Sequence, residues 1–180
     1  MNHIIIAQYK EDIEWALHLP DSWKVLVMKK GDGPGPWLPN VGREPHSFLT
    51  YLANYYDDIK DESLYVFVQG NPFDHCPTIL SVLEGTPSGK FMHLGKGDLF
   101  VSEGDGRPHH SGLPVKELYE KWLHKTWPGQ VGFTPGGQFM LSGEQIKQRP
   151  KSFYEMLLSE VVEGQNCYVL ERLWFDVFHP

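Results

Sequence analysis

The chain has 180 residues, which is the size of one domain and enough to bury a substantial core. Hydrophobic residues make up 41% and charged residues 22%, ordinary values for a folded protein that argue against general disorder. The formal net charge of −7 argues against a duplex DNA partner, because binding to many phosphates needs clustered Lys and Arg.

The cysteines and the opening residues bear on location. Cys76 and Cys167 are the two cysteines, and neither belongs to a Cys-x-x-Cys pair, which argues against structural zinc and favours a reducing setting. Residues 1–8 lack the charged segment of a signal peptide, and no apolar run approaches the roughly 20 residues of a membrane span. We therefore expect a cytoplasmic protein.

The first half of the chain alternates apolar strands with helical patterns. Strands are predicted at 3–9, 23–30 and 64–69, and helices at 13–19, 45–56 and 77–83. The stretch 31–45 holds four Gly and four Pro, which predicts a loop. The strands are continuously apolar, a pattern typical of a sheet that is covered on both faces.

The second half continues with short strands and four further helices. Edge strands are predicted within 91–101 and a strand and turn over 131–142, with helices over 114–124 and 166–178. Capping-box spacings at Ser142 and Ser152 predict two helix starts. Alternating strands and helices predict one α/β domain over residues 1–180, with a mostly parallel central sheet flanked by helices.

Ligands of open α/β sheets bind beyond the carboxyl ends of the strands, and three such ends are polar here. The first carries Gln8, Tyr9, Glu11 and Asp12. Its two acidic residues either contact a ligand or cap the helix that follows, where the helix dipole favours them.

The other two polar ends carry the groups with the richest chemistry. After Gln69 and Asn71 come Asp74 and His75, which suit a metal or proton transfer, although Asp74 could equally cap the next helix. The loop from Asn40 to His46 contains Gly42 and Arg43; the latter offers a planar fork for phosphate or carboxylate, unless it pairs with Glu44.

Two Gly-rich stretches follow. The turn at Gly136, Gly137 and Gln138 either lets a ligand approach the backbone closely or simply forms a tight turn. The pair His109 and His110 falls in a Gly-rich loop, and we expect that loop to be solvated.

Glu171 is the most informative single residue, because its helix is apolar around most of its circumference. A carboxylate there is either bonded inside the protein or faces a cleft as a base, and the spacing fits both. Arg172 and Asp176 lie four residues apart, which predicts an exposed ion pair on the same helix.

Four stretches of the chain resemble an uncharacterised domain family, a domain of unknown function seen in bacteria, fungi and their relatives. They are residues 38–44 (LPNVGRE), 66–75 (VFVQGNPFDH), 133–139 (FTPGGQF) and 170–174 (LERLW). The resemblance covers nearly the whole chain. That family is more distantly similar to glycosyltransferases of the GT-A fold, which implies a reduced GT-A-like domain.

The resemblance implies a catalytic role and a set of ligands. The opening strand and its acidic turn look like a nucleotide-binding start, the Gly-Gly turn like an acceptor-side segment, and the Glu-Arg-Leu helix like a C-terminal helix of lipopolysaccharide sugar transferases. Enzymes of the GT-A fold usually hold a divalent ion with Asp-x-Asp, where this chain has Gln69-Gly70-Asn71. Either Asp74 supplies one ligand to Mn²⁺ or Mg²⁺, or no metal is needed.

The expected function is therefore sugar transfer from a nucleotide-sugar donor to a hydroxyl acceptor. Asp74 or Glu171 would act as the base, His75 would orient the donor or assist a metal, and Arg43 would neutralise the diphosphate. The donor is expected on Gln8, Tyr9, Glu11, Asp12, Asn40, Arg43, Gln69 and Asn71, and the acceptor on His46, Gly136, Gly137 and Gln138. A metal-dependent hydrolase built on Asp74, His75 and His46 and a carbohydrate-binding domain without activity are the alternatives.

Overall fold

The computed structural model describes residues 1–32, 37–85 and 89–180. It is an α/β fold with a six-stranded sheet in the order β3-β2-β1-β4-β8-β5. The strands of this sheet are β1 (Asn2–Gln8), β2 (Trp23–Gly31), β3 (Leu38–Pro39), β4 (Leu64–Gln69), β8 (Phe139–Ser142) and β5 (Met92–His93). A separate ribbon pairs β6 (Phe100–Ser102) with β7 (Val131–Phe133).

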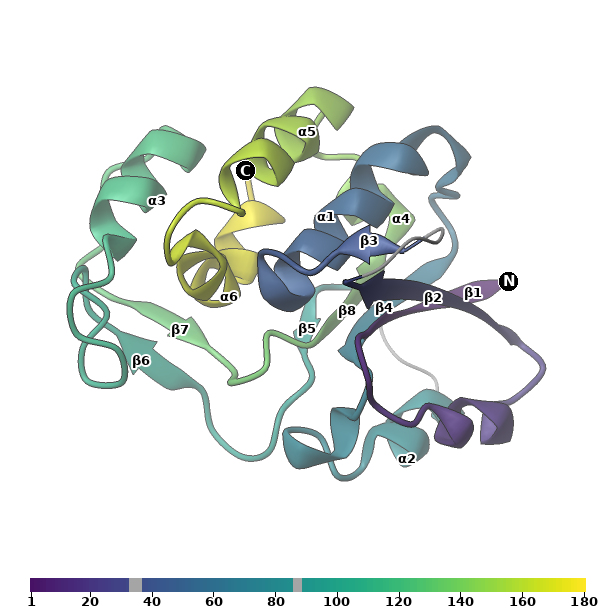
Figure 1. Ribbon diagram of the computed structural model, residues 1–180. Helices are drawn as coiled ribbons and strands as arrows, with labels where there is room; N and C mark the ends of the chain where they lie inside the picture. The colour runs from purple at the N-terminus through teal and green to yellow at the C-terminus, as the bar shows by residue number, and fades with distance from the viewer. Residues whose placement is uncertain (33–36, 86–88) are drawn as a thin grey trace.

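Helices cover both faces of the central sheet (Figure 1). The α-helices are α1 (Arg43–Asn54), α2 (Ile79–Glu84), α3 (Val115–Leu123), α4 (Gly143–Ile146), α5 (Lys151–Glu160) and α6 (Asn166–Val177), and the 3₁₀ helices are η1 (Glu14–His18), η2 (Tyr56–Asp58) and η3 (Pro72–Asp74). Helices α1, α3, α5 and α6 lie on one face, and α2 and η1 on the other.

The alternation of side chains along β1 explains this layering. Ile5 and Ala7 join the core beneath α1 and α6, whereas Ile4 and Ile6 join the smaller core beneath α2 and η1. Each of the three isoleucines is fully buried, and burial of one such side chain is worth about 1.5–3 kcal/mol. A strand that is apolar on both faces therefore holds two layers of helices.

The prediction of a mainly parallel sheet is confirmed. Strand β1 runs parallel to both β2 and β4, and β3 runs parallel to β2. Strand β8 is antiparallel to β4, because the chain enters it from the carboxyl end of β4 through the turn that precedes Phe139. That entry brings the Gly136-Gly137 turn to the edge of the sheet where the parallel strands end.

Several local predictions are corrected. The pattern at 13–19 gives only the short 3₁₀ helix η1, and α5 begins at Lys151 after Pro150, so that Ser152 is not its cap. Strand β2 is not covered on both faces, since Val25 and Val27 are 37% and 39% exposed near the margin of the sheet. The cap at Ser142 is confirmed, because its Oγ accepts a hydrogen bond from the Gln145 N–H at 3.2 Å.

The stretch 31–45, predicted as a loop, contains a short strand and the start of a helix. Residues 33–36 lie outside the described part of the chain, β3 follows at 38–39, and α1 already begins at Arg43. Arg43 therefore belongs to a helix terminus rather than to a loop, which changes what its backbone offers to a ligand.

Candidate functional site

Two adjoining cavities lie at the carboxyl edge of the parallel strands, and we call them together the edge cleft. The first has a volume of about 240 Å³ and the second about 210 Å³. The first is lined by Arg43, Glu44, Pro45, Gln69, His75, His110, Pro135, Gly136, Gly137, Cys167, Tyr168 and Glu171. The second is lined by Ala7, Gln8, Tyr9, Glu11, Lys30, Asn40, Arg43 and Glu44.

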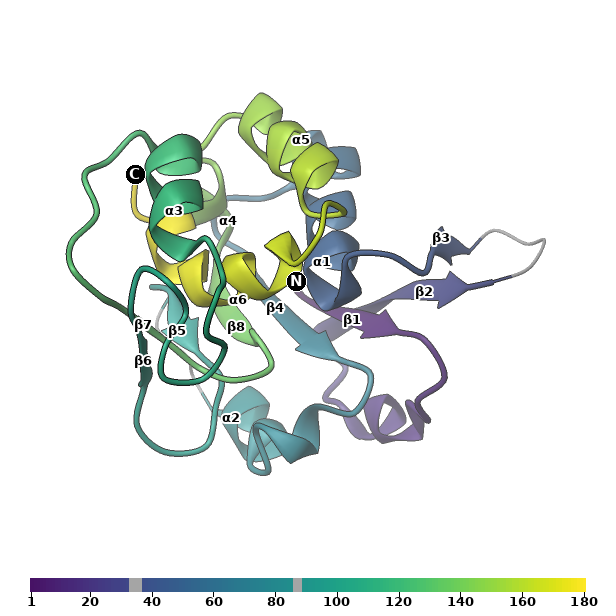
Figure 2. The ribbon, with the colours of Figure 1, turned by 60° about the vertical axis from the view of Figure 1, so that its left-hand side comes forward.

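The strand order places the edge cleft at a topological switch point. From β1 the chain moves outward through β2 to β3, and then returns over one face of the sheet through α1 to β4 on the other side of β1. Figure 2 shows α1 and α6 on this same face, where they contact each other. Crevices at such a reversal are where doubly wound sheets bind their ligands.

The start of α1 has an unusual backbone. Gly42 and Arg43 both adopt left-handed conformations, with φ angles of 59° and 48°. A Cβ at Gly42 would lie 2.9 Å from the Cβ of His46, so this position requires glycine. A left-handed Arg costs roughly 1–2 kcal/mol, and strain of this kind clusters at functional sites.

The same helix terminus favours an anion. The first three residues of α1 line the first cavity, and no side chain caps the helix. The N–H groups of Arg43 and Glu44 belong to the first turn, where they have no partner within the helix, and Pro45 carries no N–H. The positive end of the helix dipole adds to the charge of Arg43.

The Arg43 side chain is held only loosely. Its Nε lies 3.4 Å from Oε2 of Glu44, its Nη1 lies 3.5 Å from the hydroxyl oxygen of Tyr168, and 54% of the side chain is exposed. The guanidinium also lies 5.4 Å from the centre of the Tyr168 ring. Exposed pairs at such distances are worth less than about 1 kcal/mol, so a phosphate could replace them at little cost.

Glu171 lies in the first cavity with 19% of its side chain exposed. Its Oε1 accepts a hydrogen bond from the Gly136 N–H at 2.6 Å, and its Oε2 lies 3.9 Å from Nη1 of Arg172. Burial raises the pKa of this carboxyl, and the opposing effects of the Gly136 N–H and the Arg172 charge are smaller. The sequence left open whether Glu171 is bonded inside the protein or faces a cleft. In the structure it does both.

The Gly136-Gly137 turn fits between His75 and Glu171. A Cβ at Gly136 would lie 2.5 Å from Cδ2 of His75, and one at Gly137 would lie 3.2 Å from Cγ of Glu171. Both glycines also have positive φ angles, of 83° and 56°. Only glycine brings the backbone N–H this close to the carboxylate.

The second cavity contains a buried amine that the sequence reasoning missed. Lys30, at the end of β2, is 5% exposed and its Nζ donates a hydrogen bond to the carbonyl of Val41. Burial lowers its pKa to about 8, while the charge of Glu44 opposes this shift. A lysine at the end of a continuously apolar strand was a signal available in the sequence.

Ten of the predicted site residues line the edge cleft. They are Gln8, Tyr9, Glu11, Asn40, Arg43, Gln69, His75, Gly136, Gly137 and Glu171. Residues far apart in the sequence meet there because each follows a strand or opens a helix at the same edge. The carboxylate of Glu11 is nevertheless turned back onto its own loop, where it accepts hydrogen bonds from the N–H groups of Tyr9 and Lys10 at 2.7 and 3.1 Å.

Five predicted residues lie elsewhere. Asp12 accepts a hydrogen bond from the N–H of Glu14, the first residue of η1, at 2.8 Å, although the N-cap position itself is Ile13. Asn71 and Asp74 are exposed and line neither cavity, and His46 is buried and lines neither. Gln138 is fully buried and supports the site indirectly, since it accepts from the Gln69 N–H and donates to the Pro72 carbonyl.

Helix α6 contributes more to the cleft than its sequence indicated. Tyr168 lies one turn before Glu171, a spacing that could have revealed it. Arg172 is not in the predicted exposed pair with Asp176, because it is 1% exposed and its Nη2 lies 2.8 Å from Nδ1 of His110. His110, 62 residues earlier, left no signal in the sequence. Residues 107–112 of its loop are exposed, as expected, but the His110 ring contacts Arg172.

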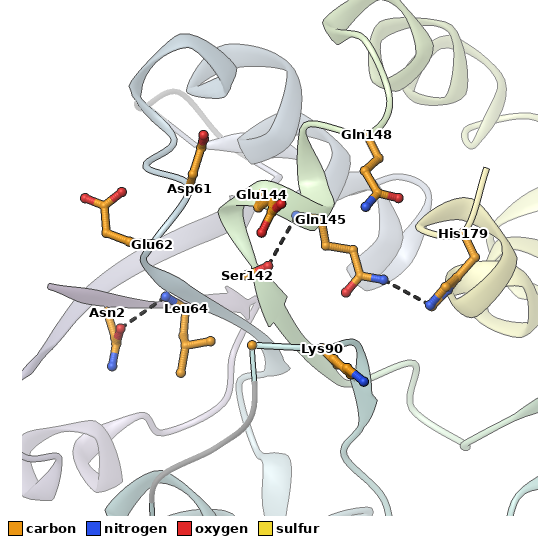
Figure 3. A pocket seen from close by; sticks show the side chains of 11 residues that line it. Asn2, Asp61, Glu62, Leu64, Lys90, Ser142, Glu144, Gln145, Gln148 and His179 are labelled. Atoms are coloured by element: carbon orange, nitrogen blue, oxygen red, sulfur yellow. Dashed lines mark hydrogen bonds between the residues drawn. The ribbon is translucent and has the colours of Figure 1, made fainter.

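A wider hollow of about 870 Å³ lies at the opposite, amino edge of the sheet. Its polar side chains serve local structure: Asn2 accepts from the Leu64 N–H, and Gln145 bonds to Phe178 and His179. Figure 3 shows the carboxylates of Asp61 and Glu62 pointing away from Lys90 rather than converging with it. We call this hollow the amino-edge groove.

Acidic and imidazole groups do not gather into a metal site within residues 1–32, 37–85 and 89–180. No three His, Cys, Asp or Glu side chains come close enough there to hold an ion. Asp74, the residue proposed as a ligand, lies outside the cavities that contain Glu44 and Glu171.

No family model, curated protein or solved structure matches the chain. Among the helices that the structure describes, none is long and apolar enough to cross a membrane.

Proposed function

We propose that this chain is a glycosyltransferase that moves a sugar from a nucleotide-sugar donor to a hydroxyl group of an acceptor. One observation carries the proposal: a partly buried carboxylate, Glu171, lines the same cavity as Arg43 and the uncapped start of α1. Sugar transfer needs both parts, because a hydroxyl must lose a proton while a diphosphate leaves with added negative charge.

The second cavity provides room for the nucleotide part of the donor. It lies at the ends of β1 and β2, and Tyr9, Asn40 and Lys30 supply an aromatic ring, an amide and a cation. Arg43 and Glu44 belong to both cavities, so a molecule that fills both places its middle beside Arg43. The order β3-β2-β1-β4 is that of doubly wound nucleotide-binding sheets, which also supports a reduced GT-A-like domain.

The reaction follows from these positions. The acceptor hydroxyl gives its proton to the Glu171 carboxylate and its oxygen forms a bond to the anomeric carbon of the donor sugar. The bond from that carbon to the diphosphate breaks, and its electron pair goes to the leaving oxygen, whose charge Arg43 and the N–H groups of α1 stabilise. A pKa raised by burial suits Glu171 to this task, since a base works best with a pKa near the working pH.

The alternatives are less well supported by the described residues. A hydrolase would need Asp74, His75 and His46 around one ion, yet Asp74 is exposed, His46 is buried, and neither lines the cleft. The absence of a cavity between the end of β4 and α6 would have favoured a domain without activity, but a cavity of about 240 Å³ lies there, and a carbohydrate-binding domain would use it for binding alone.

A thermal-shift titration tests the proposal. The wild-type protein is heated with UDP, GDP, CDP or ADP and with their sugar conjugates, each with and without Mn²⁺ or Mg²⁺. A ligand at a hundred times its dissociation constant stabilises by about 2.7 kcal/mol, which is readily seen. We expect at least one nucleotide diphosphate to raise Tm, and the rise to be smaller in Arg43→Ala. If no nucleotide raises Tm, the proposal is wrong.

A further inference from the structure

We infer that His110 is a specificity-determining residue that donates a hydrogen bond from Nε2 to an acceptor polyol, and that Arg172 fixes it in that role. The choice of a polyol as the ligand rests on the proposed function. The contact between Arg172 and His110, and the tautomer that it fixes, do not. It begins with the loop that carries His110, which connects β6 to α3.

The loop is built by its own hydrogen bonds. The N–H of Gly106 donates to the carbonyl of Glu103 at 2.9 Å, and the N–H of His110 donates to the carbonyl of Gly106 at 3.0 Å. Gly106 has a φ angle of 85°, and a Cβ there would lie 2.1 Å from the His110 carbonyl oxygen. Arg107 adds an ion pair with Asp105 at 2.7 Å. The position of His110 is thus set by the backbone around it.

The guanidinium of Arg172 then determines which ring nitrogen of His110 carries the proton. Nη2 of Arg172 lies 2.8 Å from Nδ1 of His110. A guanidinium donates hydrogen bonds and cannot accept them, so Nδ1 must be the acceptor. The proton of the neutral ring is therefore on Nε2, which becomes a donor, and this tautomer is fixed for as long as Arg172 stays in place.

Arg172 has little freedom to move. It is 1% exposed, its Nη1 donates to the Tyr168 carbonyl, and its guanidinium lies 4.7 Å from the centre of the Phe133 ring. Its Nη1 also lies 3.9 Å from Oε2 of Glu171. One guanidinium therefore contacts both His110 and the proposed base, which places a fixed donor and a fixed acceptor in one small region of the first cavity.

A donor beside a base matches a ligand with neighbouring hydroxyl groups. One hydroxyl donates its proton toward Glu171, while the next accepts a hydrogen bond from Nε2 of His110. Sugars and other polyols have this arrangement, whereas an isolated alcohol fills only one of the two places. A site built to bond a second hydroxyl rejects analogues that lack it, because the polar group of the protein is then left unpaired.

The first test reads the tautomer directly. Long-range ¹H–¹⁵N spectra of protein labelled on histidine are recorded at neutral pH, and the His110 signals are assigned by their loss in His110→Gln. We expect a protonated Nε2 and an unprotonated Nδ1, and a mixture of tautomers in Arg172→Gln, where the amide can turn and offer its oxygen. A protonated Nδ1 in the wild type would overturn the inference.

The second test reads the ligand, with glycerol, myo-inositol and methyl β-glucoside as polyol probes and ethanol as the single-hydroxyl control. We expect saturable shifts of the His110 signals with a polyol and none with ethanol, and at least tenfold weaker binding in His110→Ala. His110→Gln keeps a donor near the place of Nε2 and should restore part of the affinity. His109→Ala is the matched control, because its ring stacks on Phe100 instead.

The outcomes separate this inference from the proposed function. Nucleotide binding should be unchanged in His110→Ala, because the donor side lies on Arg43 and the second cavity. If UDP binds but no polyol does, or if His110→Ala binds polyols as the wild type does, the role of His110 is wrong while the proposed function stands. If polyols bind through His110 and no nucleotide binds, the proposed function fails instead.

Discussion

The amino and carboxyl edges of the central sheet differ more in the side chains that line their cavities than in the volumes of those cavities. The amino-edge groove is wider, at about 870 Å³, but its polar side chains serve helix and strand ends. The edge cleft is smaller, yet it contains a partly buried carboxylate, a buried amine and a left-handed Arg. Each of these costs stability, and groups of this kind cluster at functional sites.

The largest effect is expected at Glu171. Glu171→Gln keeps the shape and can still accept the hydrogen bond from Gly136, but it removes the base. Turnover should fall at least about a hundredfold, since general base catalysis contributes roughly 10²–10⁴-fold. Initial rates on the true substrate measure this.

The matched control for Glu171 lies in the amino-edge groove. Glu144 is exposed there, and Glu144→Gln should keep full turnover. If Glu171→Gln folds and turns over like Glu144→Gln, then Glu171 is not the base. A variant that loses stability but keeps the turnover of its folded fraction would make Glu171 structural.

The next effect concerns pH and the buried His46. Burial, with a smaller effect of the Lys30 charge, lowers the pKa of His46 to about 4 from an ordinary value of 6.5. Between these values the native state binds fewer protons than the unfolded state, so stability is full above pH 6.5 and is lost as the pH falls toward 4. A shift of this size corresponds to about 3 kcal/mol.

His46→Gln should remove that part of the pH dependence. Urea unfolding at several values of pH between 4 and 7 measures it as a smaller rise in the free energy of unfolding. His93, whose pKa is also lowered to about 4, has burial alone as the cause. Lys30→Gln should therefore raise the pKa of His46 and leave that of His93 unchanged, and an equal change in both would contradict this account.

The Gly136 turn should be sensitive to a single methyl group. Gly136→Ala should lose about 2 kcal/mol more in unfolding free energy than Gly129→Ala, because the new Cβ would meet the ring of His75. Gly129 is a fair control: it has a positive φ angle of 96°, and no heavy atom lies within 4 Å of its Cβ position. Equal losses in the two variants would show that the turn is not confined by His75.

The smallest effect is expected for Arg43 on nucleotide binding. Arg43→Ala should weaken binding of a nucleoside diphosphate about tenfold, the loss of one charged hydrogen bond. Lys90 carries the same charge in the amino-edge groove, and Lys90→Ala should bind as the wild type does. Titration calorimetry with UDP compares the two, and a larger loss in Lys90→Ala would move the site to the other edge.

Sequence patterns predicted correctly those features that depend on residues close together in the chain. The continuous apolar runs at 3–9 and 64–69 predicted parallel strands of one sheet, and the structure pairs them directly. Polar residues at their ends predicted Gln8 and Gln69 in one cleft. The spacing of the last helix also identified Glu171. These inferences rely on periodicity and on strand ends, which are properties of a few neighbouring residues.

Contacts between residues far apart in the sequence could not be predicted in this way. Asp74 follows a strand end as His75 does, but the short turn of η3 leaves it exposed outside the cleft. Arg172 has the spacing of an exposed ion pair, yet a loop 62 residues away covers it. Such outcomes depend on how distant segments pack, and residues four apart carry no information about that.

The central claim is that the ligand binds at the carboxyl edge of the sheet. Backbone ¹H–¹⁵N spectra recorded during a titration with the nucleotide diphosphate that raises Tm test this most directly. The account predicts saturable shifts at residues 8–11, 42–46, 69–75, 136–138 and 168–171, with little change at Lys90 and residues 142–148. Shifts confined to the amino-edge groove would contradict it.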